Sequence, residues 1–155
     1  MKVKKLWADL ETFSETPIKN GTYRYAEDSE IMLFLYAFDD GEVQCWDLTT
    51  GAPIPKDLEE LLLNSDCEVW ASNSMFDRTV LSYNGYKVPV ERWRDTMVQA
   101  LCHALPGGLD KLCGIFGIAE EDAKLKDGRA LIHLFCKPRP KNMKLRRATR
   151  ETHPE

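Results

Sequence analysis

Two acidic motifs hold the residues of this chain best suited to chemistry. Asp9–Thr12 (Asp-Leu-Glu-Thr) closes an apolar N-terminal run, and Asn73–Asp77 (Asn-Ser-Met-Phe-Asp) follows a second apolar run. Side chains two positions apart on a strand point to the same face, so Asp9 and Glu11 are expected to lie side by side. The second motif adds Asp77 in the first turn of an expected helix.

A carboxylate pair of this kind suits a hard cation such as Mg²⁺, which takes oxygen ligands and is usually held by one or two carboxylates. The run that precedes Asp9 is apolar enough to lie inside a sheet. Two carboxylates buried there would be costly unless a cation neutralised them. We therefore expect a metal site where the first strand ends.

Hydrophobic patterns and turn signals predict the elements that must position these acids. Asp39-Asp40-Gly41 is expected to join two antiparallel strands, and 14–29 is expected to be a polar loop. Trp7, Trp46, Trp70 and Trp93 each fall on an expected strand and are interpreted as core aromatics. The strands are expected at 3–10, 30–38, 42–48, 68–72 and 92–95, and the helices at 55–63, 73–83, 95–104, 109–116 and 128–136. This order fits an α/β fold with a mixed sheet of about five strands flanked by helices, although the alternation alone permits other α/β folds.

The two acidic motifs resemble those of the DEDD superfamily, the DnaQ-like 3′–5′ exonucleases. Arg94–Thr96 (Arg-Asp-Thr) and Leu105–Leu109 (Leu-Pro-Gly-Gly-Leu) carry the resemblance further, and it covers about residues 4–145. The proofreading domains of phage and bacterial DNA polymerases are the most similar branch. The resemblance implies a ribonuclease H-like fold.

The resemblance to the DEDD superfamily also implies catalytic roles for Asp9, Glu11 and Asp77 as ligands of two Mg²⁺ or Mn²⁺ ions. Asp9 would bridge both ions, with Glu11 on one and Asp77 near the other. Such a pair of ions clamps the attacking water and the leaving oxygen at a phosphodiester. The implied substrate is single-stranded DNA or a DNA 3′ end, and the implied products are nucleoside monophosphates.

Five further residues are candidates for contact with the substrate. By resemblance, Thr12 and the backbone of Leu10 would contact the terminal nucleotide. Phe13 could stack on a base, which tolerates any sequence, or could belong to the core. Asn73 could orient its motif or cap the following helix, and Phe76 is interpreted as a core residue in preference to a base-stacking one.

The superfamily also has a C-terminal motif, Tyr-x-x-x-Asp or His-x-x-x-x-Asp, that supplies a fourth acid. Tyr36 and Asp40 have the right spacing, but they lie between the other two motifs on an expected strand. None of the three histidines is followed by an acid at the required distance. We interpret Asp95 as a helix cap and not as a substitute ligand. The expected activity is therefore weak or absent unless another chain completes the site.

The domain is accordingly expected to occupy 1–136 and to be incomplete at its C-terminal side. A basic tail at 137–155 would lead into a helix that the chain lacks, since 152–155 (Thr-His-Pro-Glu) has the form of a capping box. The tail contains seven Lys or Arg residues. These could contact a phosphate backbone, or the tail could be a solvated linker or a surface helix. A homodimer through this region is also plausible.

The composition limits the class of protein. With 155 residues and 43% hydrophobic content, the chain can form one domain with a substantial core. We expect no membrane span and no signal peptide. The five cysteines lack Cys-x-x-Cys pairing, which favours reduced thiols in a cytoplasm, that of the host if a phage encodes the protein. The alternative is zinc bound by Cys102, Cys113, His133 and Cys136.

Three functions remain open from the sequence. The first is an exonuclease module that edits the growing strand for a DNA polymerase chain or domain. The second is a non-catalytic fragment that binds DNA or a polymerase partner. The third is a stand-alone nuclease that acts on RNA or short oligonucleotides.

Overall fold

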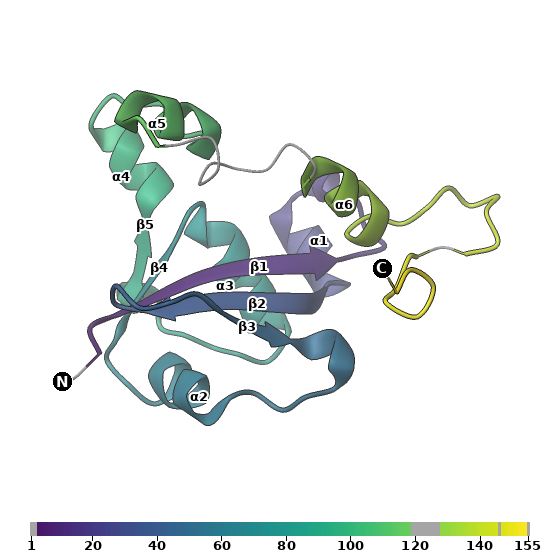
Figure 1. Cartoon of the computed structure of the whole chain (residues 1–155), viewed down its shortest axis with the longest axis horizontal. Coiled ribbons are helices and arrows are strands. Elements are labelled where there is room, and N and C mark those ends of the chain that lie inside the picture. The colour runs from purple at the N-terminus through teal and green to yellow at the C-terminus, as the bar shows by residue number, and fades with distance from the viewer. Residues whose placement is uncertain (1–2, 119–127, 146, 155) are drawn as a thin grey trace.

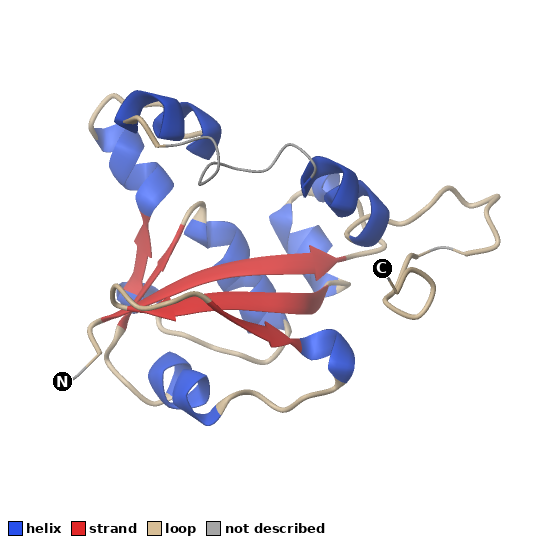
Figure 2. Ribbon diagram, in the orientation of Figure 1, coloured by secondary structure: helices blue, strands red, loops and turns tan. Residues whose placement is uncertain are grey.

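Five strands form one mixed sheet in the order β3-β2-β1-β4-β5 (Figures 1 and 2). The computed structural model describes residues 3–118, 128–145 and 147–154. β1 is antiparallel to β2, and β2 is antiparallel to β3, whereas β1, β4 and β5 run parallel. The strands are β1 (Lys5–Phe13), β2 (Glu30–Phe38), β3 (Gln44–Asp47), β4 (Glu68–Ala71) and β5 (Trp93–Asp95). The predicted α/β fold with a five-stranded mixed sheet is therefore confirmed.

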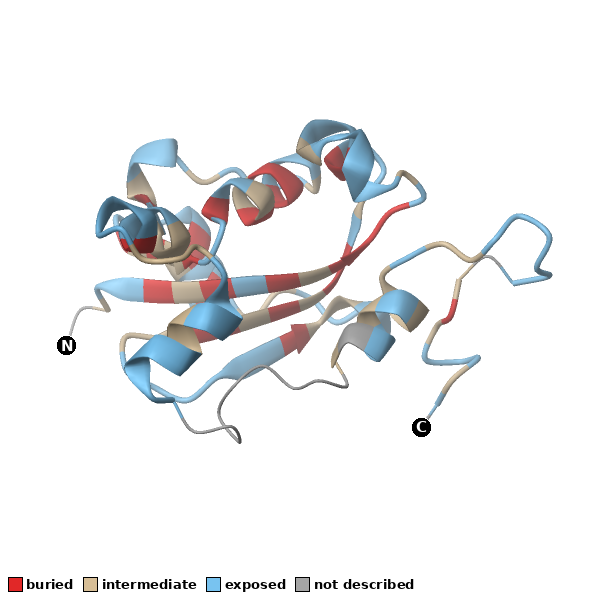
Figure 3. Cartoon of the chain, turned by 90° about the horizontal axis from the view of Figure 1, so that it is seen from above, coloured by how far each residue is buried: buried red, intermediate tan, exposed pale blue. Residues whose placement is uncertain are grey.

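Three helices pack against one face of this sheet, namely α1 (Thr22–Glu27), α2 (Lys56–Leu63) and α3 (Ser74–Tyr83). The other helices of the described residues are α4 (Thr96–Cys102), α5 (Leu109–Phe116) and α6 (Gly128–Phe135). Side chains of α1, α2 and α3 form a single buried cluster with Leu6, Phe34 and Val69 of the strands. Figure 3 shows buried residues along the strands and along the helices that cover this face. α4 and α5 lie beyond β5, and α6 lies beside the far end of β1 (Figure 1).

The alternation of β1 separates the core from the candidate site. Leu6, Ala8 and Leu10 are buried and face the helices, whereas Asp9 is exposed and Glu11 is half-buried on the opposite face. The β1–β2 ladder shifts register between Glu11 and Thr12, which marks a β-bulge. Bulges often lie near active sites, where they change the direction of a side chain.

Most predicted elements are confirmed, and some bounds are wrong. β2 and α5 have the predicted bounds, and Lys56–Leu63 forms the predicted short helix after Pro55. β1 continues to Phe13, so Asp9 and Glu11 lie within the strand and not at its end. Its pairing with β2 explains the extension, because that ladder continues to the partners Phe13 and Glu30.

The prediction of a loop at 14–29 is wrong, because this segment contains α1. The helix begins after Gly21, whose φ of 98° suits glycine better than any residue with a side chain. Tyr25 and Ala26 are buried in the core. The hydroxyl of Tyr25 lies 2.8 Å from the Thr12 hydroxyl. A helix of six residues in a polar segment has too few apolar positions to show a helical period.

The interpretation of the four tryptophans holds for only two of them. Trp46 and Trp93 are buried in the core. Trp7 and Trp70 are half-buried and lie on the face of the sheet that carries Asp9. Hydrophobicity alone placed all four in the core, but the face that each strand residue occupies depends on its register in the ladder.

The C-terminal tail contacts the sheet instead of extending into solvent. The Arg147 guanidinium lies 4.2 Å from the centre of the Phe13 ring, and Arg147 also pairs with Glu30. Arg150 pairs with Asp47 at 3.1 Å, and Ala148 between them is only 1% exposed. The predicted helix start at 152–155 is not formed at 152–154, which are turn and coil, and its last residue lies outside the described residues. Across the described ranges, no helix is both long and apolar enough to span a membrane.

Candidate active site

The acidic motifs meet where β1 loses one of its neighbours. β4 pairs with β1 only from Lys5 to Trp7, and the chain then turns from β4 into α3. Beyond Trp7, that side of β1 is therefore open to the first turn of α3. The backbone of Leu10 hydrogen-bonds to the carboxyl group of Asp77, so this turn lies directly against the strand.

Asp77 is the buried acid of the site, with 3% of its surface exposed. Its pKa is raised to about 7, mainly by desolvation and in addition by the negative charge of Asp9. Hydrogen bonds from the backbone of Asp77 itself and of Leu10 act in the opposite direction, and Asp95 adds a smaller increase. Asp9 and Asp77 therefore form an electrostatically unfavourable pair that a bound cation would relieve.

Glu11 contacts the segment that follows α6. The thiol of Cys136, the residue after α6, donates a hydrogen bond of 3.5 Å to the Glu11 carboxylate. Burial raises the pKa of Cys136 to about 12, and the charge of Glu11 contributes to the shift. Glu11 is half-buried and Asp9 is exposed, so the expectation that both carboxylates are buried is wrong.

No ready-made metal cluster is present in the described part of the chain. Among residues 3–118, 128–145 and 147–154, no group of three or more His, Cys, Asp or Glu side chains is placed to hold a metal ion. The structure thus brings Asp9 and Asp77 together and leaves Glu11 against Cys136. The four residues of the zinc alternative are not gathered into such a group either.

Asp95 connects the starts of two helices. Its carboxylate accepts hydrogen bonds from the backbone amides of Met97 and Val98 at the start of α4, which confirms the predicted cap. It also accepts from the amides of Asn73 and Ser74 and from the Ser74 hydroxyl, at 2.7–3.1 Å. Desolvation raises the pKa of Asp95, but these hydrogen bonds together lower it below its ordinary value.

Asn73 takes part through its backbone. It is the N-cap residue of α3 and adopts a left-handed conformation with φ 63° and ψ 49°. Its side chain makes no capping hydrogen bond, so the capping role considered for that side chain is wrong. Asparagine tolerates this conformation better than most residues, and here it directs the amides of Asn73 and Ser74 toward Asp95.

The other substrate-contact candidates lie in or near the core. Phe76 packs against the core and has its ring centre 5.6 Å from that of Tyr25, which confirms the core interpretation. Thr12 is buried beside Tyr25. Phe13 is 4% exposed beneath Arg147, so its ring is not available to a base in this conformation. Nucleotide contact by Leu10, Thr12 and Phe13 stays a prediction.

Sequence reasoning missed Tyr25, Cys136 and Arg147 as neighbours of the site. Tyr25 lies in the segment that was expected to be a loop. Cys136 and Arg147 are far from β1 in the sequence, and no short-range pattern reports such contacts. The signal in the sequence was the basic character of the tail, which was considered for contact with a phosphate backbone and not with the sheet.

Comparison with known proteins agrees with this architecture. The chain is 38% identical over 161 residues to the DNA polymerase of Bacillus phage SP02, a match that covers 99% of the chain and 24% of the polymerase. NrnC of Brucella melitensis with bound Mg²⁺ superposes with a TM-score of 0.58 at 15% identity, over 83% of this chain and 63% of NrnC. The chain has a ribonuclease H-like fold.

NrnC bound to pGG is a second structural neighbour, with a TM-score of 0.56 at 16% identity, over 81% of this chain and 56% of NrnC. The chain thus spans about a quarter of the length of the polymerase and less than two thirds of NrnC. No protein-family model matches the chain.

Proposed function

We propose that this chain is a metal-dependent nuclease module that removes nucleotides from DNA 3′ ends, as polymerase proofreading modules do. The observation that carries the proposal is the contact between the first turn of α3 and β1, which places buried Asp77 beside Asp9. The similarity to a phage DNA polymerase over nearly the whole chain supports a role beside a polymerase chain or domain. A homodimer stays a prediction.

The donor set at this position fits a hard divalent cation. Asp9, Glu11 and Asp77 offer only carboxylate oxygens, which Mg²⁺ and Mn²⁺ prefer. These three residues would hold the metal, and Glu11 would have to turn away from Cys136 to join them. When bound, the metal would lower the pKa of an attacking water and neutralise charge on the phosphodiester. The structural neighbour that carries Mg²⁺ supports this choice of ion.

The chain's own residues hold these carboxylates in place. The rigid centre of the sheet fixes Asp9, and α3 fixes Asp77 through its packing on the core and its capped start. The C-terminal acid of the DEDD pattern has no counterpart in the sequence. We therefore propose that cleavage with these three acids alone is slow, and that a fourth acid would accelerate it.

A second candidate substrate is RNA or a very short oligonucleotide. The support for it is the structural neighbour NrnC in complex with pGG. A protein distinguishes RNA from DNA at a given position through the ribose 2′-hydroxyl. The non-catalytic alternative predicts nucleic-acid binding with no cleavage at all.

The test is digestion of 5′-labelled DNA and RNA of the same sequence with Mn²⁺ or EDTA, alongside Asp9→Ala. We expect stepwise loss from the DNA 3′ end that requires both the metal and Asp9. Faster loss of RNA or of dinucleotides would favour the second substrate class. Binding without cleavage under any condition would overturn the nuclease proposal.

A further inference from the structure

A pair of tryptophans lies beside the acidic site on the exposed face of the sheet. Trp7 of β1 and Trp70 of β4 are partners in the parallel ladder, so their side chains lie next to each other. Their ring centres are 5.4 Å apart, and the ring planes are inclined by 45°. Both are half-buried, and neither belongs to the buried core cluster.

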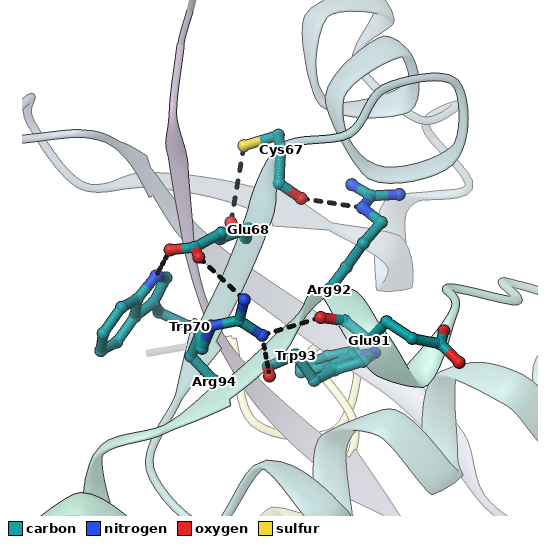
Figure 4. Close-up of polar contacts among 7 residues, drawn as sticks. All are labelled: Cys67, Glu68, Trp70, Glu91, Arg92, Trp93 and Arg94. Atoms are coloured by element: carbon teal, nitrogen blue, oxygen red, sulfur yellow. Dashed lines mark hydrogen bonds and ion pairs between the residues drawn. The ribbon is translucent and has the colours of Figure 1, made fainter.

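Hydrogen bonds fix the orientation of both rings. The indole N–H of Trp7 donates to the backbone carbonyl of Asp39 at 2.9 Å. The indole N–H of Trp70 donates to the Glu68 carboxylate at 3.0 Å, and Figure 4 shows this contact. The polar atom of each indole is thus already used. What the two rings offer a ligand is flat aromatic surface.

Two cations flank this surface. The ammonium group of Lys5 lies 5.1 Å from the centre of the Trp70 ring and 5.9 Å from that of Trp7. On the other side of Trp70, Arg94 pairs with Glu68 at 2.9 Å (Figure 4), and its side chain is 42% exposed. Flat aromatic rings flanked by cations match the chemistry of a nucleobase and its phosphate.

The tryptophan pair lies on the N-terminal side of the acidic site along β1. Lys5, Trp7, Asp9 and Glu11 lie on the same face of the strand, and Trp7 precedes Asp9 by a rise of about 7 Å. At the other end of this row, Cys136 covers Glu11 and Arg147 covers Phe13. Among the described residues, the row is covered at its Glu11 end, whereas Lys5 at the other end is exposed, and a nucleic-acid strand could continue there.

We propose that Trp7 and Trp70, with Lys5 and Arg94, form a binding surface for single-stranded nucleic acid upstream of the nucleotide that is removed. The terminal nucleotide lies at Asp9, and the preceding bases stack on the two rings as the strand leaves toward Lys5. This inference rests on the proposed function, because Asp9 marks the scissile position. It adds a binding site that the acidic motifs do not include.

Fluorescence anisotropy with labelled oligothymidylate in EDTA tests the proposal, because cleavage is then blocked. The variants are Trp7→Leu and Trp70→Leu, with Trp70→Phe as the conservative replacement that keeps a ring. Tyr83→Leu is the matched control, since Tyr83 is an exposed aromatic residue of α3 with half of its surface accessible. Circular dichroism and thermal unfolding check that each variant is folded.

We expect each leucine variant to bind the oligonucleotide about tenfold more weakly, as for the loss of one stacked base. Trp70→Phe should retain most of the affinity, and Tyr83→Leu all of it. Lys5→Gln should reduce the slope of log affinity against log salt by about 0.7, the value for one phosphate contact on a single strand. Equal binding by all variants, or no binding by the unmodified protein, would overturn the proposal. Binding of an apolar peptide in place of the oligonucleotide would also overturn it.

Cleavage of the p-nitrophenyl ester of thymidine 5′-monophosphate by the same proteins separates this inference from the proposed function. This ester carries a single nucleotide and has no preceding base to stack on the tryptophans. If the leucine variants lose oligonucleotide binding but cleave the ester normally, both proposals are supported. If the tryptophans are needed for binding and no protein cleaves any substrate, only the nuclease proposal fails.

Discussion

Asp77 is the residue whose environment is most unusual. A carboxyl group with 3% of its surface exposed, beside a second acid, is held in its neutral form until about pH 7. The pair of Asp77 and Asp9 therefore opposes folding at high pH when no metal is bound. The same charge density attracts a divalent cation, so binding of the cation is coupled to loss of the Asp77 proton.

Asp77→Asn is predicted to stabilise the metal-free protein at pH 8 more than at pH 4.5. Burial raises the pKa of Asp77 from 3.8 to about 7, so the folded protein retains a proton that the unfolded chain loses above pH 4. Stability therefore falls as pH rises through this range, by an amount on the order of a few kcal/mol, and the amide removes the effect. Thermal unfolding in EDTA at several pH values measures it.

The matched control is Asp57→Asn, which changes an acid of the same type in the first turn of α2, away from the site. Its effect on the unfolding temperature should not follow the pH profile of Asp77→Asn. An Asp77→Asn difference that stays constant from pH 4.5 to pH 8 would show that the pKa of Asp77 is not raised.

At the scale of elements, one carboxylate connects β5, α3 and α4. Asp95 ends β5, caps α4, and accepts three hydrogen bonds from the turn that begins α3. Because Asp77 lies in the first turn of α3, Asp95 is a positioning residue for the acidic pair. It supports the start of that helix through these hydrogen bonds.

Asp95→Ala is predicted to destabilise the protein by about 2–4 kcal/mol, because it removes two helix-start interactions and leaves partly buried donors unpaired. Urea unfolding measures this loss. Asp57→Ala is the matched control, since Asp57 lies in the first turn of a single helix, α2. A loss for Asp95→Ala no larger than that for Asp57→Ala would contradict the double role.

The contact of the tail with the sheet is the second feature at this scale. Arg147 lies on the buried Phe13 ring and pairs with Glu30. Its side chain is 24% exposed and that of Glu30 is 64% exposed, so the packing on Phe13 is the shielded part of the contact. Loss of Arg147 should release the segment that follows α6. The Glu11 end of the row formed by Lys5, Trp7, Asp9 and Glu11 would then become uncovered.

Arg147→Gln is predicted to increase several-fold the rate at which trypsin cleaves after Lys141, Lys144 and Arg150, sites that the variant retains, because the tail loses its anchor on β1 and β2. Mass spectrometry of the early fragments gives this rate. Arg24→Gln removes an exposed pair with Glu27 that contributes little, so it serves as the control and should leave the rate unchanged. Equal rates for all three proteins would contradict a role for Arg147 as the anchor.

At the scale of the whole molecule, local patterns predicted the fold well. The apolar run in Glu30–Phe38 and the Asp39–Gly41 turn predicted the antiparallel pair, and the start signals at Pro55 and Asp95 located two helices. These features depend on residues close in sequence, and the resemblance to DnaQ-like exonucleases added the topology. The acidic motifs could be recognised for the same reason.

What the sequence did not predict depends on long-range packing. The half-buried positions of Trp7 and Trp70 on the face of Asp9 follow from the register of the β1–β4 ladder. The contact of Cys136 with Glu11 joins residues far apart in the chain, and no local pattern indicates it. The hydrogen bond between Cys136 and Glu11 is therefore a finding of the structure alone.

The central claim is that Asp9 and Asp77 together bind a divalent cation, and calorimetric titration with Mn²⁺ tests it most directly. We predict one or two bound ions at pH 8, and at least about tenfold weaker binding in Asp9→Asn and in Asp77→Asn. Asp57→Asn should bind as the unmodified protein does. Unchanged Mn²⁺ affinity in both site variants, or no binding by any of the proteins, would contradict the claim.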